Sequence, residues 1–279
     1  MINFNPYPYQ LKGIEWIIQH PESALLWEMG LGKSVVTLTA IQELIDECEI
    51  SRALVVAPKK VAETTWTTEA AKWNHLQGMK VAKVMGTEKQ RKLALNEKAD
   101  IYVIGRDNFV WLVGLYGGQL PFDVLVIDEL TSFKNSKSQR FKAMRIARPS
   151  VKRVIGLTGT PAPNGLIDLW GQMYCVDKGV RLGKSVTKYR ETYFETRSWN
   201  NIVVRCDVKK GCEEIIRNKI ADICLSMQAK DYLQLPDLMM HTVPVELSPA
   251  TMSAYNKFER EKVLEFKQEH EGEPTNILA

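Results

Sequence analysis

The chain has 279 residues, 45% of them hydrophobic and 25% charged, with a formal net charge of +4. These values are ordinary for a globular protein and leave room for one large or two modest domains. No apolar run approaches the roughly 20 residues that span a bilayer, and residues 1–8 lack a basic stretch followed by an apolar one, so we expect an intracellular protein without a membrane partner.

Cysteine usage and the placement of charge narrow the function classes. The five cysteines are widely spread without a C-x-x-C pair, so we expect reduced, structural thiols and not a zinc or redox site. Residues 134–153 carry eight basic side chains and no acidic one. This run is typical either of a solvated helix face or of a surface for a phosphate backbone.

Short apolar and β-branched runs alternate with helical stretches between residues 24 and 175, as in a parallel sheet covered by helices. Several runs are apolar throughout, which is typical of strands buried on both faces. Thr87 and Gln90 form a capping box that predicts the start of a helix. The expected strands are Ala24–Leu26, Ala53–Ala57, Val81–Met85, Ile101–Ile104, Val124–Ile127 and Arg153–Leu157.

The first strand leads into a glycine-rich turn that ends in Lys33-Ser34. Such a turn offers backbone N–H groups and an ammonium to the phosphates of a nucleotide, and a hydroxyl to Mg²⁺, which makes Lys33 a catalytic candidate and Ser34 a metal ligand. The strict phosphate-loop pattern fails because Trp27 stands at its first glycine position, and the turn alone is also compatible with a plain helix entry. The strand before it and the helix after it favour an anion site. The candidate nucleotide-binding residues in this turn are Met29, Gly30, Leu31, Gly32, Lys33 and Ser34.

An acidic pair, Asp128-Glu129, follows the strand expected at Val124–Ile127. Acidic pairs often only cap a strand, but Mg²⁺ beside a phosphate loop gives two carboxylates a reason to end an apolar strand. We expect Asp128 to hold Mg²⁺ and Glu129 to orient or deprotonate the attacking water, so both are catalytic candidates. Thr158 and Thr160 follow the next strand and either sense the γ-phosphate or are simple turn hydroxyls.

Beyond residue 175 the alternation of strands and helices stops. We expect a smaller, mainly helical attachment there, with a hairpin at Trp199–Asp207 whose turn is Asn200-Asn201. Ser248-Pro249 predicts the start of a charged helix that runs to about His270. The expected segments are therefore an α/β lobe at 1–175, the attachment at 176–247, and the charged helix with its tail at 248–279.

These motifs, in this order, resemble those of the Swi/Snf-related ATPases of helicase superfamily 2. The acidic pair continues as D-E-L-T and F-K-N, and the following T-G-T-P-A-P-N has L-W downstream, as in that family. The resemblance covers roughly residues 7–175, with a weaker echo at Leu235-Pro236 and at Val245–Pro249. The residues that carry it are Tyr9, Gln10, Gly13, Trp16, Glu28–Ser34, Ala57–Val61, Trp66, Asp128–Thr131, Phe133–Asn135, Thr158–Asn164, Leu169 and Trp170.

The resemblance implies a RecA-like P-loop NTPase lobe that hydrolyses ATP with Mg²⁺ and moves along double-stranded DNA. Gln10 is then expected to read the adenine edge, and Thr158 and Thr160 to couple the nucleotide to DNA. Tyr7 or Tyr9 is placed to stack on the adenine, and we favour Tyr9. The residues expected to contact the DNA backbone, without reading sequence, are Lys59, Lys60, Lys134 and Asn135.

The chain also departs from the family pattern. Trp27 stands where Asp is more usual, and Leu130-Thr131 replaces Ala-His. Neither a second series of strands and helices nor an arginine-finger pattern follows, so we expect the second RecA-like lobe to be absent from this chain, and the chain alone to hydrolyse ATP barely above background. The lack of chromatin-binding modules favours a bacterial or phage type and a cytoplasmic location, or a nuclear one in a eukaryote.

Two alternatives remain open at this point. The chain is compatible with another superfamily 2 motor, such as an RNA helicase or a restriction translocase subunit. It is also compatible with a scaffold that binds nucleotide and DNA without turnover.

Overall fold

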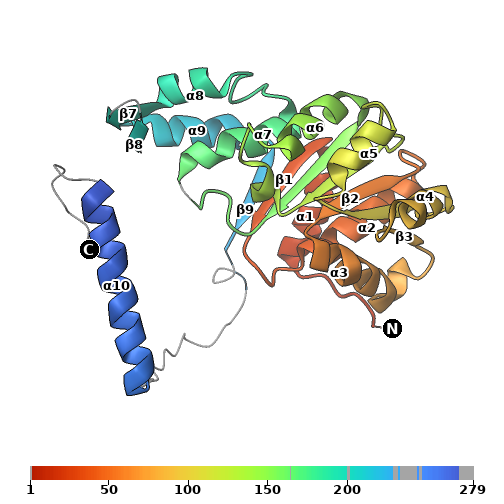
Figure 1. Cartoon of the computed structure of the whole chain (residues 1–279). Coiled ribbons are helices and arrows are strands. Elements are labelled where there is room, and N and C mark those ends of the chain that lie inside the picture. The colour runs from red at the N-terminus through yellow and green to blue at the C-terminus, as the bar shows by residue number, and fades with distance from the viewer. Residues whose placement is uncertain are drawn as a thin grey trace. The chain divides into compact units, whose positions relative to one another are not determined.

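The structure is a computed structural model that describes residues 2–163, 165–199, 202–228, 232, 244 and 247–269 (Figure 1). The chain divides into two compact units, residues 1–234 and 235–279. Among the described residues, every helix is too short or too polar to cross a membrane.

The second unit contains helix α10, Pro249–Glu269. The Ser248 hydroxyl accepts a hydrogen bond from the Thr251 amide at 3.2 Å, as an N-cap does. This confirms the predicted helix start at Ser248-Pro249. Its expected end at His270, and the motif echo at Leu235-Pro236, lie outside the described residues.

A seven-stranded sheet forms the centre of the first unit, in the order β3-β4-β2-β5-β6-β1-β9. All its strand pairs are parallel, so the carboxyl ends of the strands meet at one edge. The five inner strands are mostly apolar and almost wholly buried because helices cover both faces. The bounds of all seven strands are β1 Glu22–Trp27, β2 Ala53–Ala57, β3 Val81–Val84, β4 Ile101–Gly105, β5 Val124–Asp128, β6 Arg153–Thr158 and β9 Cys224–Met227.

All six expected strands are present, with ends that differ by no more than two residues, and β2 has the predicted bounds. The seventh strand, β9, was not predicted. It pairs with β1 from Ala24↔Cys224 to Trp27↔Met227. Its four residues alternate between buried and more exposed positions, as suits an edge strand, and this short pattern gives little signal in a sequence.

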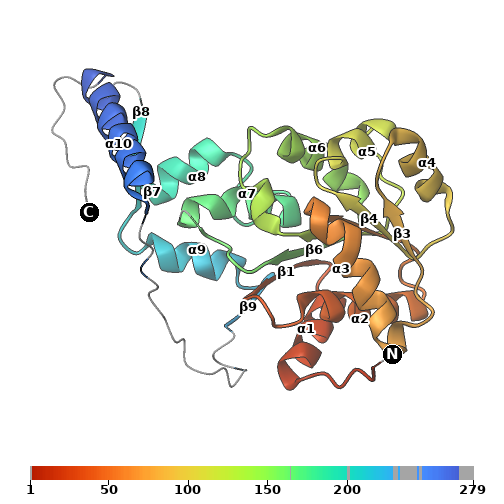
Figure 2. The same ribbon diagram turned by 60° about the horizontal axis from the view of Figure 1, so that its bottom comes forward.

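Helices form one layer on each face of the sheet, as Figures 1 and 2 show. Alternate residues of a strand point to opposite layers: Val55 joins the apolar cluster of α1, α2 and α3, whereas Leu54 and Val56 join the cluster of α4 to α7. Thr87 and Gln90 form the predicted capping box at the start of α4. The helices are α1 Pro8–Gln19, α2 Lys33–Asp46, α3 Lys59–Lys72, α4 Glu88–Asn96, α5 Phe109–Leu115, α6 Gln139–Ala147 and α7 Leu169–Asp177.

The segment after α7 contributes two helices, a hairpin and β9. The hairpin is antiparallel and wider than predicted, with Phe194 opposite Val208, and its expected turn at Asn200-Asn201 lies outside the described residues. The expected boundary at residue 175 falls inside α7, and the attachment shares the core of the lobe, since the buried Tyr189 hydroxyl donates to Leu166 O at 2.8 Å. The remaining elements are α8 Val186–Tyr193, β7 Phe194–Trp199, β8 Ile202–Val208 and α9 Cys212–Ile220.

Charged side chains join the elements at the amino end of the sheet. Arg148 is 1% exposed and donates to Cys175 O at 3.1 Å, to Val176 O at 2.6 Å and to the Glu22 carboxylate at 2.9 Å. Arg153 donates to Ile17 O at 2.9 Å, at the end of α1. Two of the eight basic residues in 134–153 are therefore internal links, so this run does not form a single basic surface.

Candidate nucleotide site

Three segments that the sequence analysis selected meet at the carboxyl edge of the sheet. Strands β1, β6 and β5 are neighbours, with Leu26 opposite Thr158 and Leu157 opposite Asp128. The turn after β1, the end of β6 and the acidic pair after β5 therefore lie side by side. Open parallel sheets bind their ligands at this edge.

The glycine-rich turn before α2 adopts a backbone that only glycine takes easily. Gly30 and Gly32 have φ values of +85° and +79°. A Cβ at Gly32 would lie 2.6 Å from Nε2 of Gln10, so the turn also needs glycine for space. Because α2 begins at Lys33, the N–H groups of its first turn have no partner within the helix and suit a phosphate.

Lys33 folds back onto its own turn. Its ammonium donates to Trp27 O at 2.8 Å and to Glu28 O at 3.1 Å. Burial lowers the pKa of Lys33, while the nearby Asp128 and Glu129 carboxylates oppose that shift. The predicted phosphate ligand and the predicted acidic pair are thus close enough to interact electrostatically.

Asp128 receives a hydrogen bond that the sequence analysis did not foresee. The indole N–H of Trp66 donates to Asp128 Oδ2 at 2.9 Å. Burial raises the pKa of the Asp128 carboxyl, the Trp66 hydrogen bond and Lys33 oppose the shift, and Glu129 adds to it. Trp66 is 0% exposed, so it belongs to the core, but its indole N–H also reaches the site.

Glu129 has a left-handed backbone, with φ of 62°, that turns the chain sharply after β5. The hydroxyls of Thr131 and Thr158 both donate to its Oε1, the latter at 3.0 Å. Thr158 in turn accepts from the Thr160 amide at 3.2 Å. Glu129 thus links Thr131, which stands in place of the family's histidine, to Thr158, one of the two expected coupling threonines.

Gln10 lies at the site, whereas Tyr9 does not offer a face to a base. Gln10 is 7% exposed, and its amide donates to Leu31 O at 3.3 Å. Tyr9 is 5% exposed and packs against the rings of Tyr7, Trp27 and Tyr232. Tyr7 is 56% exposed. Burial covers the faces of the Tyr9 ring and leaves Tyr7 the more accessible of the two, and which of them stacks on adenine stays a prediction.

The oxygen ligands available here fit Mg²⁺. Ser34 stands in the first turn of α2, which follows β1, and Asp128 ends β5, which is separated from β1 by β6. Among the described residues, no group of three or more His, Cys, Asp or Glu side chains is arranged to hold a metal. Mg²⁺ is commonly held by one or two carboxylates together with substrate phosphates and water, so a single carboxylate and a hydroxyl match a metal that arrives with a nucleotide.

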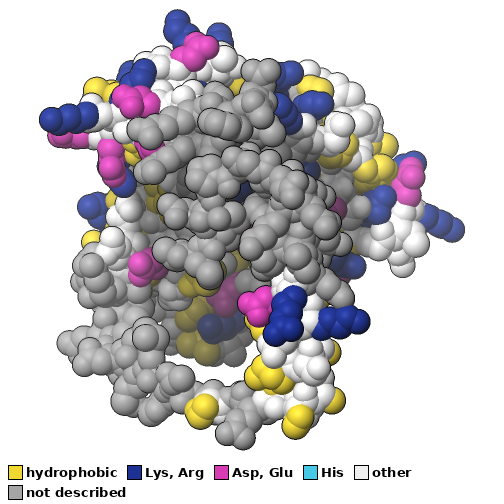
Figure 3. Space-filling model, turned by 60° about the vertical axis from the view of Figure 1, so that its left-hand side comes forward, with side chains coloured by type: hydrophobic (Ala, Val, Ile, Leu, Met, Phe, Trp, Pro, Cys, Tyr) yellow, Lys and Arg dark blue, Asp and Glu magenta, His cyan; other side chains and the backbone are white. Residues whose placement is uncertain are grey.

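The residues expected to contact DNA are only partly brought together. Lys59 and Lys60 are exposed in the first turn of α3. Lys134 forms an ion pair with Asp168 at 3.1 Å, and the Asn135 side chain accepts a hydrogen bond from a nearby backbone amide at 2.9 Å. On the described part of the face seen in Figure 3, Lys and Arg side chains are interspersed with Asp and Glu.

Helix α7 contacts two segments of the site. Only a weak sequence signal pointed to these contacts. Gln172 is fully buried and donates to Pro161 O at 2.5 Å, in the T-G-T-P segment. A Cβ at Gly171 would lie 2.5 Å from Lys134 O, so glycine allows α7 to approach the chain after the acidic pair. The L-W pair at the start of α7 was the only motif that pointed here. Asn164, at the end of the preceding motif, lies outside the described residues.

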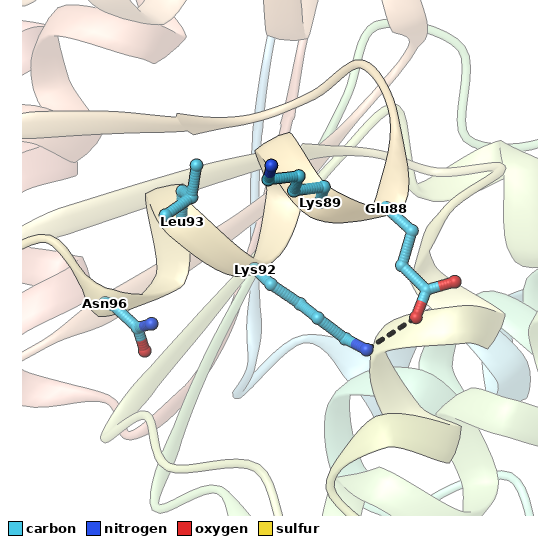
Figure 4. Close-up of a pocket in the computed structure, with 5 residues that line it drawn as sticks. All are labelled: Glu88, Lys89, Lys92, Leu93 and Asn96. Carbon is cyan, nitrogen blue, oxygen red and sulfur yellow. Dashed lines mark ion pairs between the residues drawn. The ribbon is translucent and has the colours of Figure 1, made fainter.

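A hollow on α4 differs from the site, because residues of a single helix line it. The lining residues include Lys92 and Glu88, which form an ion pair at 2.6 Å (Figure 4). No second element brings a polar group toward it among the residues that line it. The carboxyl edge of the sheet, where the turn after β1, the end of β6 and the acidic pair after β5 converge, is therefore the candidate site.

Comparisons with known proteins point to one family. Residues 9–279 match the SNF2-related domain. A putative protein p41 of Acyrthosiphon pisum secondary endosymbiont phage 1 is 35% identical over an alignment of 277 residues, and the match covers 95% of this chain and 59% of that protein. Helicase SWR1 of Mycosarcoma maydis is 34% identical over 176 residues, 60% of this chain and 9% of that protein.

Two solved structures have the same fold. The SWI2/SNF2 ATPase core of Sulfolobus solfataricus in complex with double-stranded DNA superposes with a TM-score of 0.66 and 27% identity, over 82% of this chain and 45% of that one. A second structure, of the Sulfolobus solfataricus SWI2/SNF2 ATPase core domain, gives a TM-score of 0.64 and 25% identity, over 95% of this chain and 52% of that one. The chain thus spans about half the length of these cores.

Proposed function

The chain belongs to the SNF2-related domain family and carries its ATPase fold, and on this premise we propose that it is the first lobe of a motor that hydrolyses ATP when bound to duplex DNA. The proposal rests on one observation above others. The turn with Lys33 follows β1 and the pair Asp128-Glu129 follows β5, on the two sides of β6 at the carboxyl edge of the sheet, and the two carboxylates oppose the effect of burial on the pKa of Lys33.

Each residue has a part that follows from its place. The N–H groups at the start of α2 and the Lys33 ammonium bind the phosphates, after the ammonium leaves the carbonyls of Trp27 and Glu28. Ser34 and Asp128 hold Mg²⁺, which neutralises phosphate charge when it is bound. Glu129, held at Oε1 by Thr131 and Thr158, accepts a proton from water through its other oxygen.

Duplex DNA is the proposed stimulating partner, because a related core was solved in complex with double-stranded DNA. Lys59 and Lys60 remain our candidates for phosphate contacts, since both are exposed on one helical turn next to the site. The second lobe is also part of the proposal. The chain spans 45% of that core, and an arginine supplied across a cleft is worth about 10³ to 10⁵ in rate in enzymes of phosphoryl transfer.

Steady-state ATP hydrolysis tests the proposal. The 279-residue chain is assayed alone and when joined to a second lobe from a relative such as the phage protein, each with duplex DNA, RNA or no nucleic acid. We expect stimulation by duplex DNA in the two-lobe protein and almost no turnover by the chain alone. Stimulation by RNA would favour an RNA helicase, and tight nucleotide and DNA binding without turnover would favour a scaffold.

A further inference from the structure

Trp66 joins two segments of the lobe that lie far apart in the sequence. Helix α3 follows β2 directly, and β2 pairs with β5 from Ala53↔Val124 to Val56↔Ile127. The indole N–H of Trp66 on α3 donates at 2.9 Å to Asp128 Oδ2 at the end of β5. The hydrogen bond therefore ties this helix of the first layer to the predicted metal ligand.

The burial of Trp66 holds its ring in one orientation. The side chain is 0% exposed within the apolar cluster beneath α1, α2 and α3, so the ring has no room to turn. Indole has one polar hydrogen and no acceptor, and its N–H needs a partner when it is buried. Asp128 Oδ2 is that partner. The indole hydrogen bond therefore does not use the other carboxylate oxygen, Oδ1.

We propose that Trp66 is a positioning residue, which fixes the Asp128 carboxylate so that Oδ1 faces the magnesium ion that accompanies ATP. The proposal rests on the function proposed above. Partners that orient a metal ligand typically change metal affinity by about 10-fold to 100-fold when they are removed. The expected loss at Trp66 is at the lower end of this range, because Asp128 itself remains.

Trp73 provides a matched control. It follows the last residue of α3, and its indole N–H donates at 2.9 Å to the Glu69 carboxylate. The two tryptophans thus make the same kind of hydrogen bond, one within α3 and one directly after it, but only the bond of Trp66 is to a residue of the site. Trp66→Phe and Trp73→Phe each remove one indole–carboxylate hydrogen bond.

The experiment measures binding and needs no turnover. Mn²⁺, which is observed directly by electron paramagnetic resonance, is titrated into the 279-residue chain with a non-hydrolysable ATP analogue. We expect Trp66→Phe to weaken Mn²⁺ binding about 10-fold and Trp73→Phe to leave it unchanged. In EDTA, a fluorescent ATP analogue should bind both variants as it binds the parent, because the phosphate turn is intact.

A second variant separates the hydrogen bond from packing. Replacement of Trp66 by 3-benzothienylalanine keeps the shape of the ring and removes only the N–H, so it decides the matter if Trp66→Phe does not fold. Unchanged Mn²⁺ affinity in this variant would overturn the proposal for Trp66 alone. If the parent chain shows no nucleotide binding that depends on a divalent metal, the proposed function fails as well, and the two failures are thus distinguishable.

Discussion

The two ends of the central sheet hold charged side chains in opposite ways. At the amino end, Arg148 donates to three backbone carbonyls and to Glu22, and Asp177, which is 0% exposed, accepts from the amides of Gly179 and Arg181. Each buried charge there has partners of the opposite sign or polarity. These contacts link α7, β1 and the segment before β9. All the partners named are groups of the chain itself.

At the carboxyl end, the charges are less well matched. Asp128 and Glu129 are neighbours of like sign, and Lys33 donates only to carbonyls of its own turn among the contacts described. Burial lowers the pKa of Lys33 and raises the pKa of Asp128, so it favours the neutral form of each side chain. The charges at the amino end therefore stabilise the fold, whereas the buried and less well matched charges at the carboxyl end cost stability, as is common at functional sites.

The largest expected effect on stability is at the amino end. Arg148→Met should lower the free energy of unfolding by about 3–5 kcal/mol, because it takes the donor from three buried carbonyls and leaves Glu22 with only the longer ion pairs to Lys178 and Arg181. Lys152→Met is the control, since Lys152 pairs with Asp123 at 3.1 Å but is 74% exposed, and its loss should cost less than about 1 kcal/mol. Urea unfolding of both variants measures the difference. Equal stabilities would remove the contrast between the two ends.

A change of catalytic rate without a change of fold is expected at the carboxyl end. Glu129→Gln keeps the shape of the side chain and its contacts with Thr131 and Thr158 but removes the base. ATP should still bind, and hydrolysis by the two-lobe protein should fall by roughly 10². Rapid-quench measurement of phosphate release gives the rate. A variant that turns over at the parental rate would exclude Glu129 as the base.

The pH dependence of stability should have opposite signs at the two ends. The folded state raises the pKa of Asp128 through burial, so its charged form costs stability above the unfolded pKa of about 3.9 and costs none below it. Asp128→Asn should therefore gain up to about 1 kcal/mol at pH 7, and the gain should vanish as pH falls below that value.

Asp222 gives the opposite case. Its hydrogen bond from Arg181 lowers the pKa of Asp222, so the charged form adds stability that is lost as pH falls through the folded pKa. Asp222→Asn should destabilise the protein at pH 7 by less than about 1 kcal/mol, because this pair is exposed. Urea unfolding at pH 3, 5 and 7 tests both variants, and a shared sign would contradict the comparison.

The smallest effect is expected for DNA. Lys59→Ala with Lys60→Ala should lower the slope of log affinity against log salt by about 2, one for each phosphate contact. Adding Lys134→Ala should change the slope little, because Lys134 pairs with Asp168. Fluorescence anisotropy with duplex DNA at several salt concentrations measures the slope. An unchanged slope in the double variant would exclude α3 as the DNA contact.

Most strands of the sheet and the individual site residues were predictable from the sequence, but the proximity of the site residues was not. Six strands were predictable because runs such as Ala53–Ala57 are apolar on both faces, and the order of the motifs indicated which strand ends carry chemistry. The edge strand β9 was missed because four residues with an exposed side give no clear pattern. The site residues Lys33 and Asp128 were found from local patterns, but their proximity depends on the strand order.

Contacts between distant segments were beyond the sequence. Trp66 and Asp128 are 62 positions apart, so their hydrogen bond depends on the pairing of β2 with β5. The basic run at 134–153 reads as one surface, yet packing places Arg148 inside. The same holds for Tyr9, whose burial no local pattern reveals. In each case tertiary packing places the residue in a role that differs from the role its residue type alone suggests.

The most direct test of the central claim measures one variant in two ways. Lys33→Ala removes the ammonium that is held near Asp128 and Glu129 at the carboxyl end. The account predicts that titration with ATP and Mg²⁺ shows no tight binding, while urea unfolding without nucleotide gives a free energy equal to or above that of the parent chain. Unchanged ATP affinity would contradict the assignment of the site.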